Sequence, residues 1–238
     1  MTPEQELARK TRRGFLALGA GAVLIGGTVY WLKPPADADD ISPGLRTVLG
    51  FNEKVARATL FSDRNLTRTY PVSAIGKLKK NGDIGMEDEI DESAWRLKVG
   101  DKTLTLADIQ TLPKQTQTID FNCVEGWSVV TQFAGARLSD FTARFAPEGA
   151  DKKYVGMKTP DKSYYVSIDM PSALHPQTLL AWELNGKPLT QDHGAPLRLM
   201  TPVKYGIKNI KRIATIEYTG EQPNDYWAEQ GYDWYAGL

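Results

Sequence analysis

Cys123 is the only cysteine of the chain, and its side chain offers the most distinctive chemistry in the sequence. A buried cysteine usually behaves as a small hydrophobic residue. A thiolate can instead act as a nucleophile, which requires a general base, or it can bind a soft metal centre. The residue type alone leaves all three interpretations open.

Two histidines, His175 and His193, are the candidate bases for a cysteine nucleophile. His175 precedes Pro176 near the expected start of a helix, where a histidine can equally serve in capping or packing. His193 lies in a polar turn, five residues before Arg198. Their positions alone do not decide between catalysis and packing.

A series of basic residues, Arg198, Lys204, Lys208 and Lys211, follows that turn. Arginine suits a phosphate because its planar guanidinium donates two parallel hydrogen bonds, and lysine adds a point charge. A proline and a glycine interrupt the series and indicate turns with free backbone N–H groups. The series therefore predicts a site for a small anion, and a solvated basic edge strand is the alternative.

The composition is that of an ordinary globular protein, with 41% hydrophobic and 24% charged residues. The 29 Lys and Arg residues balance the 29 Asp and Glu residues, so the formal net charge is zero. A chain without a broad positive field is a poor ligand for nucleic acid. A single cysteine also rules out intramolecular disulfides. We expect one main domain and no nucleic-acid partner.

The N-terminal residues fit a twin-arginine export signal. Arg12 and Arg13 stand shortly before Phe15, and an uncharged, glycine-rich run follows. This run approaches the roughly 20 residues that cross a bilayer, so a retained membrane anchor is the alternative to a cleaved leader. We expect residues 1–40 to be the signal or anchor with a linker, and residues 41–238 to fold in the periplasm.

Alternating apolar and polar residues predict strands at 95–99 and 116–123, and the second strand delivers Cys123 at its end. Asn185 and Gly186 predict a turn, and the charged segment 77–92 predicts a solvated loop. Further strands are expected at 154–157, 164–168, 197–202 and 213–218, and helices at 138–145 and 173–183. This mixture predicts an α+β fold with mixed or antiparallel sheets.

Three motifs occur in order along the chain: CVEGWS at 123–128, HPQTLLA at 175–181 and HGAPLR at 193–198, the last followed by the lysine series. Together they resemble the molybdenum-cofactor domain of sulfite oxidases and of the periplasmic methionine sulfoxide reductase catalytic subunit. The resemblance covers residues 51–238. It implies a sulfite-oxidase-like, molybdopterin-binding α+β domain with mixed β-sheets and short helices.

The resemblance implies a molybdenum-molybdopterin cofactor with the Cys123 thiolate as the one protein ligand of the metal. Glu125 would stand near the metal as a candidate for proton handling. The other expected cofactor contacts, carried over by position, are Asn52, Thr159, His193, Arg198, Asn209, Ile210 and Lys211. His193 stands where the reductase branch has an asparagine, so the resemblance does not fix the substrate.

The implied activity is two-electron oxygen-atom transfer on a small oxoanion or on an S-oxide or N-oxide. The sequence has no haem or iron–sulfur motif, so we expect an external electron carrier such as a membrane or periplasmic cytochrome. Two alternatives remain. One is a molybdopterin- or anion-binding subunit of a membrane redox complex without turnover, and the other is a transferase with Cys123 as its nucleophile.

Overall fold

The computed structural model describes residues 41–59 and 66–238. The expected twin-arginine motif and the uncharged run after it lie outside these residues. In the described part of the chain, no helix is both long and apolar enough to span a membrane. Residues Glu53–Leu238 form one compact unit, which begins within helix α2 (Pro43–Thr59) and contains every strand described below.

One sheet of the compact unit is mixed. Its strands run in the order β2-β1-β10-β5-β6, with β1 and β10 parallel and the other neighbours antiparallel. The strands are β1 (Leu97–Val99), β2 (Lys102–Leu104), β5 (Tyr154–Lys158), β6 (Tyr165–Asp169) and β10 (Thr215–Thr219). The strands predicted at 95–99, 154–157, 164–168 and 213–218 are therefore confirmed, with shifts at their ends.

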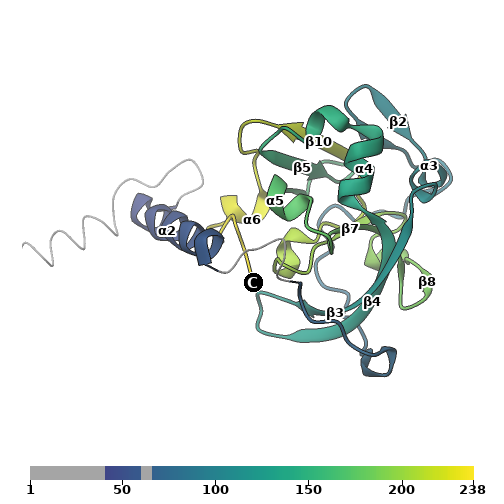
Figure 1. Ribbon diagram of the computed structural model, residues 1–238, viewed down its shortest axis with the longest axis horizontal. Helices are drawn as coiled ribbons and strands as arrows, with labels where there is room; N and C mark the ends of the chain where they lie inside the picture. Colours follow the sequence, from purple (N-terminus) through teal and green to yellow (C-terminus); the bar gives the residue numbers. More distant parts are fainter. Residues whose placement is uncertain (1–40, 60–65) are drawn as a thin grey trace, which may run out of the picture. The chain divides into compact units, whose positions relative to one another are not determined.

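The second sheet is antiparallel and has the order β3-β4-β7-β8, with β9 also paired to β7. Its strands are β3 (Lys114–Asn122), β4 (Ser128–Arg137), β7 (Leu179–Leu184), β8 (Lys187–Pro188) and β9 (Arg198–Met200). The predicted turn at Asn185 and Gly186 joins β7 to β8, and both residues have positive φ angles. Figure 1 shows β3 and β4 as a long curved hairpin.

Apart from α2, the helices are short, as the resemblance implied. They are α3 (Leu106–Gln110), α4 (Leu138–Phe145), α5 (Met170–Ala173) and α6 (Tyr226–Glu229), with 3-10 turns η1 (Val72–Ala74), η2 (Pro147–Gly149), η3 (Gln191–His193) and η4 (Gly206–Lys208). Thr105 and Asp108 form a capping box at α3. The helix predicted at 138–145 is confirmed as α4.

The helix predicted at 173–183 is wrong. Helix α5 ends at Ala173, and residues 179–184 form the buried strand β7. Periodicity cannot assign a short run of apolar residues such as Leu179–Leu184 to a helix or to a strand. Pairing with β4, β8 and β9, which lie elsewhere in the sequence, decides for the strand.

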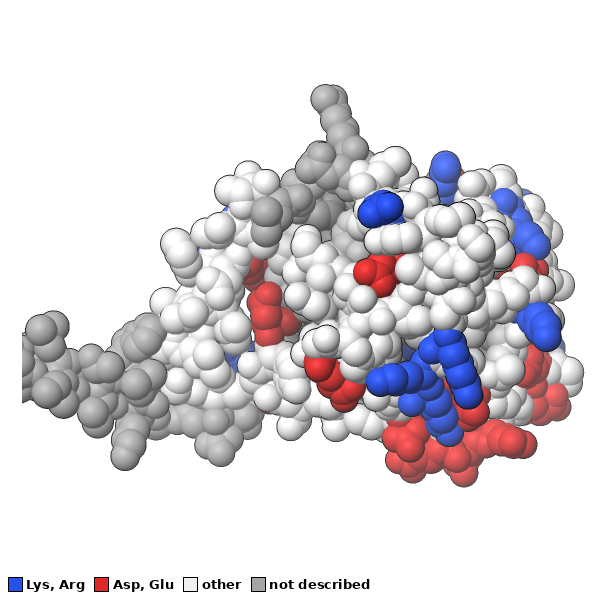
Figure 2. Space-filling view, turned by 90° about the horizontal axis from the view of Figure 1, so that it is seen from below, with Lys and Arg blue, Asp and Glu red and all other residues white. Residues whose placement is uncertain are grey.

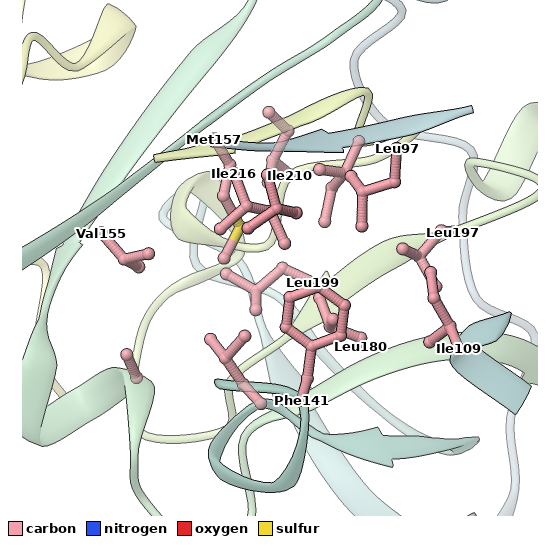
Figure 3. Packing of buried hydrophobic residues seen from close by; sticks show 14 of the residues in the cluster. Leu97, Ile109, Phe141, Val155, Met157, Leu180, Leu197, Leu199, Ile210 and Ile216 are labelled. Carbon is pink, nitrogen blue, oxygen red and sulfur yellow. The ribbon is translucent and has the colours of Figure 1, made fainter. Parts of the chain in front are cut away.

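The main core lies between the two sheets. Side chains of Met157 and Ile216 from one sheet meet Leu180 and Leu199 from the other, and Phe141 of α4 packs against them (Figure 3). Strand β4 comes so close to β7 that a Cβ atom at Gly135 would lie 2.0 Å from the carbonyl oxygen of Leu180. Only glycine fits there, and the close contact fixes β4, whose first residue follows the Cys123 loop.

Candidate active site

A cavity of about 880 Å³, including its open mouth, lies in the compact unit beside the β3–β4 loop. Segments far apart in the sequence form its walls. The residues that line it are Leu78, Lys79, Asn81, Gly82, Ile84, Phe121, Cys123, Val124, Glu125, Trp127, Tyr164, Arg198, Gly206, Ile207, Asn209, Lys211, Trp227 and Tyr232. Five of the residues predicted for the site are among them: Cys123, Glu125, Arg198, Asn209 and Lys211.

Cys123 is the first residue of the tight loop that joins β3 to β4. Its backbone N–H donates to the carbonyl oxygen of Trp127 at 2.9 Å, and Gly126 donates to the carbonyl oxygen of Cys123 at 3.1 Å. Gly126 has a φ of 85°, a left-handed conformation that favours glycine. The side chain of Cys123 lines the cavity although the residue is only 7% exposed.

Asn81 connects the two candidate catalytic residues. Its side-chain amide donates to Sγ of Cys123 at 3.5 Å and to Oε2 of Glu125 at 3.4 Å. The indole N–H of Trp127 donates to the same Glu125 oxygen at 2.9 Å. The buried thiol and the exposed carboxylate therefore share one hydrogen-bonded group, the side-chain amide of Asn81.

The sequence did not single out Asn81, because the segment 77–92 was expected to be a solvated loop. That expectation is wrong in part, since Leu78 and Met86 are buried and Asn81 lines the cavity. The Asn81-Gly82 pair is a strong turn signal that could have marked this position. The remaining charged side chains of the segment are largely exposed. On the face of the molecule seen in Figure 2, basic and acidic side chains lie side by side.

Arg198 carries a buried positive charge without a carboxylate partner in the described part of the chain. The residue is 1% exposed, and its guanidinium donates to the carbonyl oxygens of His193 at 3.1 Å and Asn209 at 3.2 Å. Burial lowers the pKa of Arg198 to about 10, so the side chain is still charged at neutral pH. A buried charge normally has a charged partner, and an anion in the cavity would supply it.

Lys211 adds a second cation to this end of the cavity. Its ammonium donates to the carbonyl oxygens of Asn81 at 2.7 Å and Gly82 at 2.9 Å. Burial, and then the charge of Arg198, lower the pKa of Lys211 to about 7. A Cβ atom at Gly194 would lie 2.7 Å from Cβ of Lys211, so the glycine allows the turn before Arg198 to approach this lysine.

The predicted basic series divides into two groups. Arg198 and Lys211 line the cavity, whereas Lys204 pairs with Asp169 at 3.4 Å and Lys208 pairs with Asp225 at 2.6 Å. Both of these lysines are buried, so the prediction of one four-residue anion site is wrong, and so is the alternative of a solvated edge. Spacing along the sequence does not show which carboxylate faces each lysine.

Four predicted cofactor contacts do not line this cavity. Thr159 is buried and donates to Asp161 at 2.6 Å, and Ile210 packs in the main core. His193 is half-buried, and its pKa is lowered by burial and then by Arg198. Asn52 is exposed in α2 and precedes the compact unit. Their contacts with a cofactor stay predictions.

The alternative of a cysteine nucleophile lacks its base. Neither histidine is among the residues that line the cavity with Cys123. His175 is buried, and its Nδ1 accepts a hydrogen bond from the backbone of Gln177 at 3.2 Å. Across residues 41–59 and 66–238, no group of three or more His, Cys, Asp or Glu residues could hold a metal ion by itself.

The cavity is thus lined by one thiol, that of Cys123, and by two basic side chains, the buried Arg198 and the half-buried Lys211. A thiolate suits a soft metal centre, and the cations suit a phosphate. These groups fit a cofactor that presents a metal and an anionic tail, and the fold and site together define a cofactor-dependent enzyme domain.

Comparison with known proteins identifies the class. Residues 84–227 match the family of the oxidoreductase molybdopterin binding domain. The protein-methionine-sulfoxide reductase catalytic subunit MsrP of Xanthomonas axonopodis is 38% identical, over 93% of this chain and 74% of that protein. MsrP of Campylobacter jejuni is 31% identical, over 100% of this chain and 83% of that protein. The fold is like that of the sulfane dehydrogenase SoxCD of Paracoccus pantotrophus, with a TM-score of 0.50 at 22% identity over 57% of this chain and 40% of that chain.

The chain therefore belongs to the family of the oxidoreductase molybdopterin-binding domain. It is a molybdopterin-dependent oxidoreductase whose cofactor is molybdenum-molybdopterin. The resemblance drawn from the three sequence motifs and the α+β fold are both confirmed. Membership of this family favours an enzyme over a binding subunit without turnover and over a cysteine transferase.

Proposed function

We propose that the chain is an exported reductase of sulfoxides, with methionine sulfoxide in polypeptides as its substrate class and Cys123 as the protein ligand of molybdenum. The relatives named above as protein-methionine-sulfoxide reductase catalytic subunits support this choice of substrate. The cavity that joins the Cys123 thiol to the buried charge of Arg198 supports the choice of ligand.

The observation that carries the choice of substrate is the aromatic character of the cavity wall. Five aromatic residues line it: Phe121, Trp127, Tyr164, Trp227 and Tyr232. The cations Arg198 and Lys211 are assigned to the cofactor phosphate, which leaves Lys79 at the wall for a substrate. An oxoanion such as sulfite would need cations of its own. The lining therefore favours a neutral sulfoxide.

The bound cofactor supplies the two-electron chemistry, and the protein supplies binding and proton delivery. Reduction of a sulfoxide consumes two electrons and two protons and yields a thioether and water. Glu125 is placed to hold one of these protons at its carboxylate, and Asn81 orients both that carboxylate and the Cys123 sulfur. Arg198 and Lys211 would neutralise the phosphate, and Asn209 would help to hold it. The further cofactor contacts carried over from the family are Asn52, Thr159, His193 and Ile210.

Turnover with artificial dyes tests this proposal. The purified, molybdenum-loaded protein is expected to oxidise a reduced viologen dye when a methionine sulfoxide peptide is added. With sulfite as the electron donor, it is expected to reduce an electron acceptor far more slowly, because Lys79 is the one lining cation not assigned to the cofactor and an oxoanion needs several. Sulfite oxidation faster than sulfoxide reduction would overturn the substrate assignment and leave the family assignment intact.

We further propose that the protein works in the periplasm and receives electrons from a separate carrier, such as a membrane or periplasmic cytochrome. Arg12, Arg13 and the apolar run after them support export, with or without retention by an N-terminal anchor. The relatives' designation as catalytic subunits supports a second polypeptide as the electron donor.

Replacing Arg12 and Arg13 together by lysine is expected to keep the protein in the cytoplasm instead of the periplasm, because twin-arginine transport recognises the arginine pair itself. Cell fractionation followed by immunoblotting measures the distribution. Replacing the nearby Arg9 and Lys10 by Lys and Arg preserves charge and serves as the matched control, with normal export expected. Normal export of the double-lysine variant would point to another route.

A further inference from the structure

The aromatic residues of the cavity differ in depth. Cys123, at the base, is 7% exposed, Trp227 is half-buried, and Tyr232 is 41% exposed. Trp227 and Tyr232 therefore line the same cavity as the candidate metal ligand but are more open to solvent than it is. Groups of a substrate that extend beyond the reacting sulfur would meet these two rings.

Trp227 and Tyr232 pack against each other and against further tyrosines. Their ring centroids are 5.2 Å apart with the planes at 73°, and the backbone N–H of Tyr232 donates to the carbonyl oxygen of Trp227 at 3.0 Å. Tyr226 packs edge-on against Trp227 at 5.2 Å and against Tyr164 at 5.5 Å. Tyr164 in turn donates to the carbonyl oxygen of Ile207 at 2.8 Å, so the rings are supported from behind.

A buried ion pair holds the backbone beneath these rings. Asp225 is 3% exposed, and its Oδ2 accepts from Nζ of Lys208 at 2.6 Å and from the backbone of Ser167 at 2.9 Å. Its Oδ1 accepts from the backbone of Ala228 at 3.2 Å and so caps α6. Asp225 thereby fastens α6 to the edge of β6. This anchor fixes Trp227 before a substrate arrives, so little ordering of the ring is needed on binding.

Aromatic rings that are rigid and partly exposed suit a polypeptide ligand. Trp and Tyr offer a large apolar face with a polar end, and they dominate the binding energy of many interfaces. Their edges also attract thioether and similar sulfur groups. A small sulfoxide such as dimethyl sulfoxide, by contrast, has no atoms beyond its two methyl groups with which to reach the outer ring.

We propose that Trp227 and Tyr232 are specificity-determining residues that bind the polypeptide part of a sulfoxide substrate, and that Asp225 is a positioning residue for Trp227. This assignment rests on the proposed reductase function. It predicts that the two rings distinguish a methionine sulfoxide within a peptide from a small free sulfoxide, whereas the groups at the base of the cavity serve both.

The test compares molybdenum-loaded wild type, Trp227→Ala and Tyr232→Ala with two substrates, a decapeptide with a central methionine sulfoxide and dimethyl sulfoxide. The ratio of kcat/KM for the peptide to kcat/KM for dimethyl sulfoxide is expected to fall about tenfold in each variant, mainly through KM. Calorimetry without an electron donor should show a rise of similar size in the Kd of the peptide. Trp227→Phe, which retains a ring, should recover most of the ratio.

Tyr70→Ala is the matched control, because Tyr70 is a half-buried aromatic residue outside the cavity that stacks on Arg68, and its ratio should equal that of wild type. Molybdenum content per chain verifies that each variant folds. An unchanged ratio and an unchanged peptide Kd in both alanine variants would overturn the assignment of these rings alone. A wild type that reduces neither sulfoxide would overturn the proposed function and this assignment with it.

Discussion

Replacing Cys123 by serine is expected to remove molybdenum from the purified protein, from roughly one atom per chain to below about a tenth of that. A serine hydroxyl is a hard ligand and stays protonated near neutral pH, so it cannot replace a thiolate at a soft metal centre. The side chain lines the cavity from a short loop that hydrogen bonds hold closed. Serine should therefore fit the same space without unfolding the loop. Elemental analysis of the purified protein measures the result.

Ser128→Ala is the matched control for this substitution. Ser128 begins β4 just beyond the same loop, is exposed and does not line the cavity, so the variant should retain its metal. Alkylation gives a second measurement, since Cys123 bonded to metal should resist iodoacetamide and the metal-free protein should react. Full molybdenum content in Cys123→Ser, or rapid alkylation of loaded wild type, would contradict the assignment of Cys123 as the ligand.

Cys123 could be placed from the sequence because local patterns determine its position. Alternation along residues 116–123 predicts a strand, and β3 ends at Asn122, directly before the cysteine. The strand at Thr215–Thr219 and helix α4 follow from equally local patterns. Where the periodicity and the length of a segment indicate the same element, the sequence predicts that element and therefore the position of the residue at its end.

The parts of the site that could not be predicted depend on contacts between distant segments. In the sequence, Lys204 and Lys208 belong to the same basic series as Arg198 and Lys211, which line the cavity. Only the fold shows that Asp169 faces Lys204 and that Asp225 faces Lys208. Asn81 reaches Cys123 from a segment that reads as a surface loop. Likewise, the apolar run of β7 is compatible with a helix or a strand, and it forms a strand because it pairs with β4.

The second large effect is expected at Arg198. Arg198→Met should lower the affinity for the cofactor by about tenfold or more, because hydrogen bonds from a charged donor to an anion are each worth about 1.5–3 kcal/mol. Molybdenum and pterin content per chain measure the loss. Lys152→Ala, which removes an exposed lysine, is the control and should leave both contents unchanged.

The stability of the cofactor-free protein separates an anion site from a purely structural arginine. Burial that lowers the pKa of Arg198 to about 10 disfavours its charged form in the folded chain. Methionine removes this cost and loses the bonds to the carbonyl oxygens of His193 and Asn209, so the two effects oppose each other. The Tm of cofactor-free Arg198→Met should therefore stay within about 5 °C of wild type, whereas loaded wild type should gain far more Tm from the cofactor than the variant does. A large and equal fall in Tm with and without cofactor would mean that Arg198 serves only to hold its neighbouring turns, because an anion that compensates its charge must stabilise the loaded state selectively.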